Sequence, residues 1–372
     1  MESNCVKWVR LGDYIEQFRQ KCANNKAIVS GVDINKRFIP TRANLDGTDI
    51  SGYYLVPPTF FACNLMHIGR DERIPIAYND TDKDLVVTSA YYVFHIKQDK
   101  CDEILNEYLY IIFSNKEIDR LTWFYTDSSI RGNLKENRFL DIKMPLPSVA
   151  EQQKVVNAWR AFREIKEQNE AKAAPLMQLC QSYIQELKHK YPMQEIGPYI
   201  HRIDERNTDN KIKEVRSVSV SKNFNATNAK VDKNNLSNYK IVRENQISFV
   251  QTTGNEKCLC AAINHLGFPI VVTSVNEVFE TDEKYLLADY LHLIFRRTET
   301  DRYARFNSWG SARETFTWED MTRFAIPLPS IEVQQAIVNI YKCANEAKQI
   351  AEEADRLSRE VCPALLQHVI HS

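Results

Sequence analysis

Two long stretches of the chain carry apolar residues at helical spacing. The first begins after a proline-rich segment at Ser148 and stops before Tyr191-Pro192. The second begins at Ser330 and continues to about Val369. Apolar side chains three and four positions apart form one apolar seam along a helix. The first seam is predicted to contain Val155, Trp159, Phe162, Ile165, Asn169, Leu176, Cys180, Tyr183 and Leu187. The second is predicted to contain Ile337, Tyr341, Ala344, Ala347, Ala351, Ala354, Leu357, Val361, Leu365 and Val369.

Each stretch predicts a helix of about 60 Å, at ~1.5 Å of rise per residue. A helix of that length with a single seam needs a partner, and the expected partner is the other helix, in a coiled coil. Packing of both seams onto the neighbouring domains is the alternative. Ser148 and Glu151 form a predicted capping box at the first helix start. Pro175 and Pro363 lie inside the two stretches and are expected to kink or split the helices.

The remaining chain alternates short β-rich runs with polar turns, and each half adds one short helical segment. This mixture predicts an α+β fold for residues 1–147 and again for residues 191–329. The clearest strand-like runs are residues 85–88, 91–94 and 270–273, and the helical segments are residues 104–113 and 285–295.

One short sequence, named here the proline phrase, occurs twice, at the end of each of these α+β stretches. Residues 144–149, Met-Pro-Leu-Pro-Ser-Val, precede Gln152-Gln153, and residues 326–331, Ile-Pro-Leu-Pro-Ser-Ile, precede Gln334-Gln335. Ordered matches elsewhere extend the repeat, while the intervening loops differ. The chain is therefore predicted to use one unit twice, as a pseudo-two-fold internal repeat. The predicted segments are domain 1 (1–147), the first helix (148–190), domain 2 (191–329) and the second helix (330–372). The further matches pair residues 11–15 with 196–200, 53–56 with 239–242, 86–89 with 271–274, and 107–109 with 289–291.

The composition indicates a folded protein without a membrane segment. Apolar residues make up 44% and charged residues 26% of the 372 positions. No apolar run approaches the ~20 residues of a membrane helix. The first residues lack the pattern of a secretory signal. Nine scattered cysteines fit reduced thiols. A cytoplasmic location is expected.

The formal net charge is −1. This balance counts against a DNA-binding protein, because basic surface supplies most of the affinity for phosphates. Local segregation of charge, or a partner subunit, can meet the same need.

Candidate DNA contacts lie in polar, irregular segments and beside repeated arginines. Arg, Lys and Asn side chains can hydrogen-bond base edges or phosphates. The alternative is that they are solvated turn residues. Both halves keep a Ser-x-Arg sequence before the proline phrase. A repeated arginine is either a structural ion-pair partner or a DNA contact, and for this arginine a phosphate or base contact is favoured. The repeated Asp119-Arg120 and Asp301-Arg302 pairs are predicted to be structural. The candidate contacts are Lys36, Arg37, Arg131, Lys222, Asn223, Asn225, Arg305 and Arg313.

No motif proposes a catalytic centre or a cofactor site. The chain lacks a P-loop and a Gly-x-Gly-x-x-Gly sequence, and it has only ten glycines. Pro57-Pro58 lacks the asparagine and aromatic of an adenine methyltransferase box. Cys258 and Cys260 have no second cysteine pair for zinc. His368 and His371 are one helical turn apart and could share a metal, but a frayed helix end is the favoured explanation.

The duplicated Pro-Leu-Pro-Ser phrase leading into Gln-Gln and a long helix resembles the DNA-specificity (S) subunit of type I restriction–modification systems. The resemblance covers the whole chain. The family pattern often has Glu-Gln in the phrase, as in Glu151-Gln152, whereas the second copy has Val333-Gln334.

The resemblance implies a non-catalytic subunit with two target-recognition domains, each reading one half of a bipartite double-stranded DNA site. It also implies that the two helices pair as an antiparallel coiled coil, which separates the domains and sets the spacer. It implies two methyltransferase (modification) subunits and a restriction subunit as partners, with S-adenosylmethionine, ATP and Mg bound by those partners and none by this chain. The alternatives are a protein-binding adaptor built on the coiled coil, an enzyme with an unrecognised site, and the specificity subunit of a related restriction class.

Overall fold

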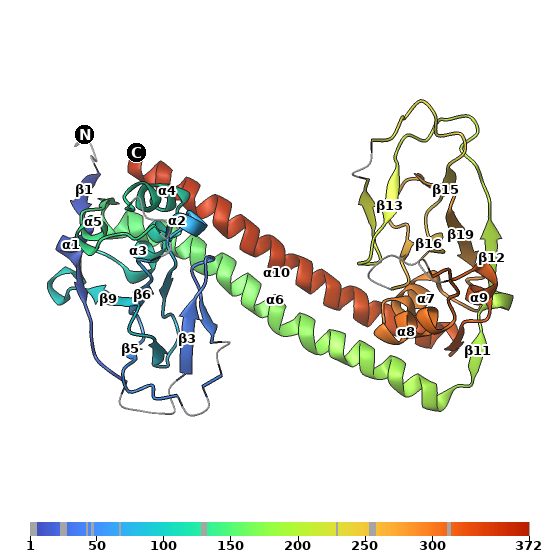
Figure 1. The fold of residues 1–372 in the computed structure, drawn as a ribbon, viewed down its shortest axis with the longest axis horizontal. Coiled ribbons are helices and arrows are strands. Elements are labelled where there is room, and N and C mark those ends of the chain that lie inside the picture. The colour runs from blue at the N-terminus through green and yellow to red at the C-terminus, as the bar shows by residue number, and fades with distance from the viewer. Residues whose placement is uncertain are drawn as a thin grey trace. The chain divides into compact units, whose positions relative to one another are not determined.

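The chain forms two compact units in the computed structural model, which describes residues 6–22, 28–41, 44–45, 48–66, 68–127, 132–227, 230–252, 258–310 and 314–371. Unit 1 comprises Met1–Gln168 and Ile350–Ser372, and unit 2 comprises Asn169–Gln349. Two long helices, α6 (Val149–Lys190) and α10 (Ile331–His371), each contribute one stretch to both units. Each unit therefore contains an α+β domain and two helix segments (Figure 1).

Unit 1 combines three sheets with short helices. Its strands are β1 (Lys7–Arg10), β2 (Ile15–Gln17), β3 (Ile28–Val32), β4 (Phe38–Pro40), β5 (Tyr54–Val56), β6 (Phe61–Cys63), β7 (Ile76–Tyr78), β8 (Leu85–Val87), β9 (Tyr92–Ile96) and β10 (Lys143–Leu146). Its short helices are α1 (Leu11–Tyr14), α2 (Ile68–Asp71), η1 (Gln98–Lys100), α3 (Asn106–Phe113), α4 (Lys116–Phe124) and α5 (Glu136–Leu140).

The sheets of unit 1 have the strand orders β2-β9-β6-β7 and β4-β3-β8-β5, and β1 pairs with β10. All pairings are antiparallel except β3 with β8. The main core lies between the first sheet, α3 and the start of α6, and Tyr108, Phe61 and Phe94 are fully buried there.

Unit 2 repeats this set of elements. Its strands are β11 (Met193–Glu195), β12 (Ile200–Ile203), β13 (Arg216–Val218), β14 (Phe224–Ala226), β15 (Lys240–Val242), β16 (Ile247–Val250), β17 (Ala261–Ile263), β18 (Ile270–Val272), β19 (Asn276–Thr281) and β20 (Ala325–Pro327). Its short helices are η2 (Gly197–Tyr199), α7 (Ala288–Phe295), α8 (Thr298–Phe306) and α9 (Trp318–Thr322).

The strand orders of unit 2 match those of unit 1. The order β12-β19-β16-β17 corresponds to β2-β9-β6-β7, and β11-β20 corresponds to β1-β10. The β13-β14 and β15-β18 pairs are linked by one parallel bridge between Val215 and Val271, at the place where β3 pairs with β8 in unit 1. The predicted fold class is confirmed: two similar α+β domains, each followed by a long helix.

The repeated Gln-Gln sequence has a structural explanation. Gln152 is fully buried, and its Oε1 accepts a hydrogen bond from Leu105 N at 3.0 Å. Its Nε2 donates to Glu103 O at 2.8 Å and to Pro147 O at 3.0 Å. Gln334 makes the same three bonds at 2.8–2.9 Å in unit 2. Each glutamine thus fastens the start of a long helix to the loop before α3 or α7, and buried amides need such partners.

The repeated Gly12 and Gly197 mark close backbone approaches. A Cβ on Gly12 would lie 3.0 Å from Leu140 Cβ, and a Cβ on Gly197 would lie 2.9 Å from Thr322 O. The contact at Gly197 is closer than a side chain tolerates, and the one at Gly12 would require Leu140 to shift, so the sequence match reflects packing.

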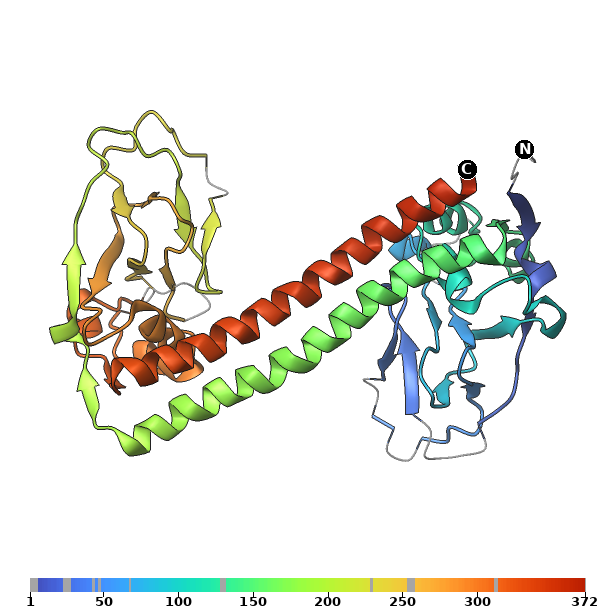
Figure 2. The same ribbon diagram turned by 180° about the vertical axis from the view of Figure 1, so that it is seen from behind.

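Within unit 1, α6 and α10 pack side by side and run antiparallel (Figures 1 and 2). Val155 near the start of α6 shares the core with Val369 near the end of α10. Further along, Lys166 Nζ lies 2.7 Å from Asp355 Oδ1. The sequence separation between contacting residues shrinks along the pair, as antiparallel packing requires.

Within unit 2, the later part of α6 packs on the first part of α10, and Cys180 Sγ lies 3.9 Å from Ile337 O. The buried positions differ in part from the prediction. Ile165 and Tyr183 are 43% and 44% exposed, and Ile184 is buried instead. The two helices bury residues at equivalent positions, with the same spacing of four and then three residues. These are Cys180, Ile184 and Leu187 in α6, and Cys362, Leu366 and Val369 in α10. The predicted alanine positions 344, 347, 351 and 354 are buried.

Pro175 and Pro363 lie within continuous helices. The expectation was a kink or a split; the split is therefore wrong, and the kink stays a prediction. A proline removes one backbone donor, but packing along both flanking stretches keeps the helix intact.

Candidate nucleic-acid interface

Two predicted DNA contacts are buried lysines. Lys36 Nζ lies 2.6 Å from Asp119 Oδ1, and Lys222 Nζ lies 2.6 Å from Asp301 Oδ1. The two lysine side chains are 7% and 6% exposed. Both lysines have a left-handed backbone, with φ of 64° and 61°, at the tip of a β-hairpin. The two units therefore repeat one ion pair that fastens a hairpin, β3–β4 or β13–β14, to a helix, α4 or α8.

This burial corrects the expectation that Lys36 and Lys222 face DNA. An ammonium enclosed by protein cannot reach a phosphate, and burial lowers the pKa of Lys36 although Asp119 opposes that shift. The prediction that the repeated aspartates are structural agrees with these contacts, but their partners are the lysines. Arg120, in contrast, is exposed and bonds Glu117 at 2.9 Å.

Arg37, the residue after Lys36, lies at the hairpin tip of unit 1. Its Nη2 lies 2.6 Å from Asp355 Oδ1 on α10, while 47% of its side chain remains exposed. This contact joins the hairpin to the long helix. The guanidinium would have to leave Asp355, or share it, in order to bind a phosphate.

Three other predicted contacts are exposed in unit 2. Asn223 follows the buried Lys222 and accepts a hydrogen bond from Arg296 Nη1 at 3.2 Å. Asn225 lies on β14 opposite Ser217. Arg305 lies on α8, one turn beyond the aspartate that holds the hairpin, and makes no ion pair with the described residues. The ion pair at Lys222 brings the hairpin and α8 together, so these side chains border one region of unit 2. Arg131 and Arg313 lie outside the described residues.

Exposed aromatic residues at the ends of α4 and α8 were not anticipated from the sequence. Phe124 ends α4 and is 75% exposed, and Phe306 ends the equally long α8 and is 88% exposed. Trp123 and Trp309 add exposed apolar surface in the respective units. Exposed aromatic surface of this kind is typical of protein interfaces.

Unit 2 contains a pocket of about 440 Å³ beside β13, lined by both apolar and polar residues. Arg216 lies in its wall, with Nη2 2.7 Å from Glu214 Oε1. Arg216 Nε is buried and has no hydrogen-bond partner among the described residues. Asn276 contributes a buried amide, and Lys230 is exposed at the rim. No sequence motif marked these residues.

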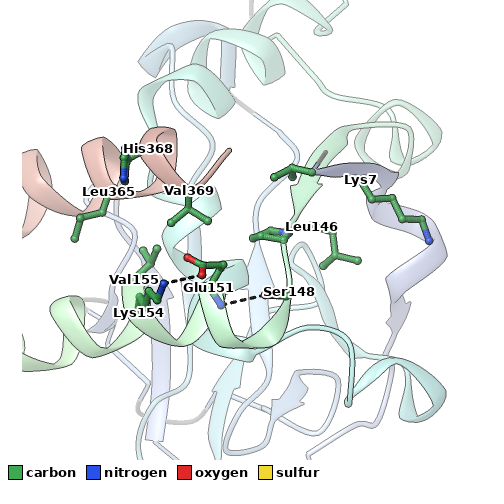
Figure 3. Close-up of a pocket in the computed structure, with 11 residues that line it drawn as sticks. Lys7, Leu146, Ser148, Glu151, Lys154, Val155, Leu365, His368 and Val369 are labelled. Atoms are coloured by element: carbon green, nitrogen blue, oxygen red, sulfur yellow. Dashed lines mark hydrogen bonds and ion pairs between the residues drawn. The ribbon is translucent and has the colours of Figure 1, made fainter. Parts of the chain in front are cut away.

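Unit 1 contains a second hollow, of about 540 Å³, where the first turn of α6 meets the last turns of α10 (Figure 3). Leu365 and Val369 form an apolar wall. Three of its polar residues are engaged with one another: Glu151 N donates to Ser148 Oγ at 3.3 Å, and Lys154 Nζ donates to Glu151 Oε1 at 2.6 Å. Ser148 therefore caps the helix as predicted, and Lys7 and His368 complete the polar lining of the hollow.

The described residues include no group of three or more His, Cys, Asp or Glu side chains placed to hold a metal ion. Along the same described ranges, no helix has the length and apolarity required to cross a membrane.

Comparison with known proteins gives matches at the level of structure. No family model matches the sequence, and no curated protein matches it. The S subunit of a type I restriction-modification system from M. genitalium superposes with a TM-score of 0.66 at 11% identity, over 99% of this chain and 97% of that one.

Two further solved structures come from the same kind of system. The HsdS subunit from Thermoanaerobacter tengcongensis has a TM-score of 0.40 at 14% identity, over 100% of this chain and 97% of that chain. A chain from a study of complex assembly and conformational transition of the type I R-M system has a TM-score of 0.45 at 13% identity, over 99% and 98%. The M. genitalium superposition spans nearly the full length of both chains. The chain therefore has the fold of a type I restriction–modification S subunit.

Proposed function

We propose that this chain is the sequence-specific DNA-recognition subunit of a type I restriction–modification complex. Each unit reads one half of a bipartite site, and the paired helices set the unread spacer. The observation that carries this proposal is the duplication: one α+β scaffold occurs twice, each copy packed on an antiparallel pair of segments from α6 and α10.

The pattern of shared and differing residues supports two different half-sites. Buried anchoring residues are the same in both units, as with Gln152 and Gln334. Surface residues at equivalent hairpin positions differ: Arg37 follows the buried lysine in unit 1, and Asn223 follows it in unit 2. Contacts to base edges specify sequence, whereas the scaffold only positions them. Two copies with different surfaces are suited to reading two different sequences.

Partner subunits carry out DNA methylation and cleavage. Two methyltransferase subunits and a restriction subunit join this chain and bind S-adenosylmethionine, ATP and Mg, while this chain is non-catalytic. The exposed Phe124 and Phe306 support a partner that binds twice, because equivalent surfaces on the two units suit two copies of one protein. A partner with basic surface would also compensate for the net charge of −1.

The chain expressed alone is expected to aggregate or to bind DNA weakly, because surface meant for partners remains exposed. Co-expression with the methyltransferase subunit encoded beside it should give a soluble complex with two such subunits per chain. Light scattering gives the stoichiometry, and sequencing of methylated adenines in plasmid DNA gives the target. A chain that binds one sequence tightly without partners would contradict this arrangement. A soluble complex that neither binds nor methylates DNA would favour the adaptor alternative.

Lengthening the helix pair tests the role of the helices. Four residues inserted after Ala171 in α6, together with four after Lys348 in α10, should keep the local pairing and extend both helices by about 6 Å, at ~1.5 Å per residue. The spacer should grow by one or two base pairs, at ~3.4 Å per step, with both half-sites unchanged. Insertion in α6 alone should impair assembly, because the two helices then differ in length. Altered half-sites with the original spacer would contradict this division of roles.

A further inference from the structure

The pocket of unit 2 lies where two equivalent positions carry different residues in the two units. The parallel bridge between Val215 and Val271 corresponds to the pairing of Val29 with Val86, so Arg216 is the counterpart of Ser30. The same alignment pairs the buried, left-handed Lys222 with Lys36.

The second pair of equivalent positions is occupied by Asn276 in unit 2 and by Tyr91 in unit 1. Each follows a Thr-Ser turn, and its backbone N–H donates to the turn threonine carbonyl, Thr273 O or Thr88 O, at 3.1 Å. In unit 1 the Tyr91 hydroxyl reaches β3, where it accepts a hydrogen bond from Val32 N at 3.1 Å. A tyrosine thus fills the space over β3. The shorter Asn276 leaves the corresponding space over β13 open.

The open space presents unused hydrogen-bonding capacity. The Nε of Arg216 is a buried donor without a partner among the described residues. Protein encloses this Nε, so a ligand would meet the outer nitrogens of the guanidinium instead. Nη2 is paired with Glu214, and 23% of the Arg216 side chain stays exposed, so the guanidinium can donate a further hydrogen bond to an acceptor in the pocket. Asn276 adds an amide to the wall, and Lys230, Asp232 and Asn235 are exposed at the rim. Val215, Val218 and Val250 also line the pocket, so it suits a flat group with apolar faces and acceptors on its edge.

We propose that this pocket reads one guanine of the second half-site, with Arg216 donating to the acceptors on the guanine edge. Guanine offers N7 and O6, and arginine is its usual protein partner. Lys230 at the rim lies where it can attract the flanking phosphate. The inference rests on the proposed function and adds that unit 1, filled by Tyr91, reads its half-site without such a pocket.

Two variants of the full complex with methyltransferase subunits test the pocket. Asn276→Tyr fills it with the side chain that unit 1 uses, and Arg216→Gln removes the guanidinium while leaving the pocket open. A plasmid library with random inserts is methylated, and the modified sites are sequenced. Both variants should lose discrimination at one position of the second half-site, on the order of 10- to 100-fold. The first half-site and the spacer should be unchanged.

Lys211→Ala is the matched control. Lys211 belongs to the same unit, is 81% exposed, and does not line the pocket. Its removal should leave the methylated sequence unchanged. A second measurement replaces the affected guanine by 7-deazaguanine, which lacks the N7 acceptor. This change should weaken methylation by the unaltered complex and have no further effect on the Arg216→Gln complex.

The outcomes separate the two proposals. A methylated sequence that is identical for the unaltered complex and both variants would overturn the pocket inference and leave the proposed function standing. Loss of methyltransferase subunits from both variants would show a protein contact and would also overturn the inference. If the unaltered complex methylates no defined sequence, the proposed function itself fails. Thermal unfolding checks that both variants are folded. If Asn276→Tyr does not fold, the result for Arg216→Gln alone decides whether the pocket reads a guanine.

Discussion

Replacing Asp119 by alanine is expected to destabilise unit 1 by about 3–5 kcal/mol, because the substitution leaves the Lys36 ammonium buried without a counter-charge. Asp119 Oδ1 also accepts a hydrogen bond from Ile74 N at 3.2 Å, and this bond is lost as well. The hairpin β3–β4 and helix α4 should loosen first, since the ion pair joins them. Urea unfolding measures the loss, and hydrogen exchange in peptides of the hairpin locates it.

Two further variants serve as controls for this effect. Arg120→Ala removes an exposed ion pair on the same helix and should change the free energy of unfolding by less than about 1 kcal/mol. Replacing both charges at once, as Lys36→Met with Asp119→Leu, should recover most of the lost stability, since no unpaired charge remains. Equal stability of Asp119→Ala and Arg120→Ala would show that the buried pair contributes little.

Acid is expected to destabilise unit 2 through His292. Burial lowers the pKa of His292 to about 4. Its Nε2 lies 3.0 Å from Lys222 O, so this nitrogen carries the proton and donates to the carbonyl. The unfolded chain takes up a proton near pH 6.5, whereas the folded chain does so only near pH 4. The contribution of His292 to the free energy of unfolding is therefore fully present above pH 6.5. It falls by about 3 kcal/mol as the pH drops from 6.5 to 4, and it does not change further at lower pH.

Unit 1 supplies the comparison for this pH dependence. Tyr110 occupies the equivalent position, and its hydroxyl donates to Lys36 O at 3.0 Å. His292→Tyr or His292→Gln should therefore remove this step from the pH profile of urea unfolding. The charged groups around His292 are Arg296 and His265, which also lower its pKa, and Asp289, which raises it. An unchanged slope in both variants would assign the acid sensitivity to other groups.

The sequence by itself determined the architecture of this protein. The two copies of the proline phrase, the ordered matches between the halves and the alternation of short β-runs with turns predicted a duplicated α+β fold. The apolar seams predicted two long helices that pair with one another. These features are readable because periodicity and repetition are local properties of the chain. The repeated glutamine was visible as a pattern, but its three buried hydrogen bonds were not.

Tertiary structure alone decided which polar residues are available for binding. Lys36 resembles a solvated turn residue, but the fold places it against Asp119, 83 residues away along the chain. The seam positions shifted from Tyr183 to Ile184 because the facing surfaces, and not the spacing alone, choose the buried side of a helix. The pocket at Arg216 depends on whether a tyrosine or an asparagine stands on a distant turn. Burial of a charge and opening of a cavity arise from contacts between remote segments, and no local pattern records them.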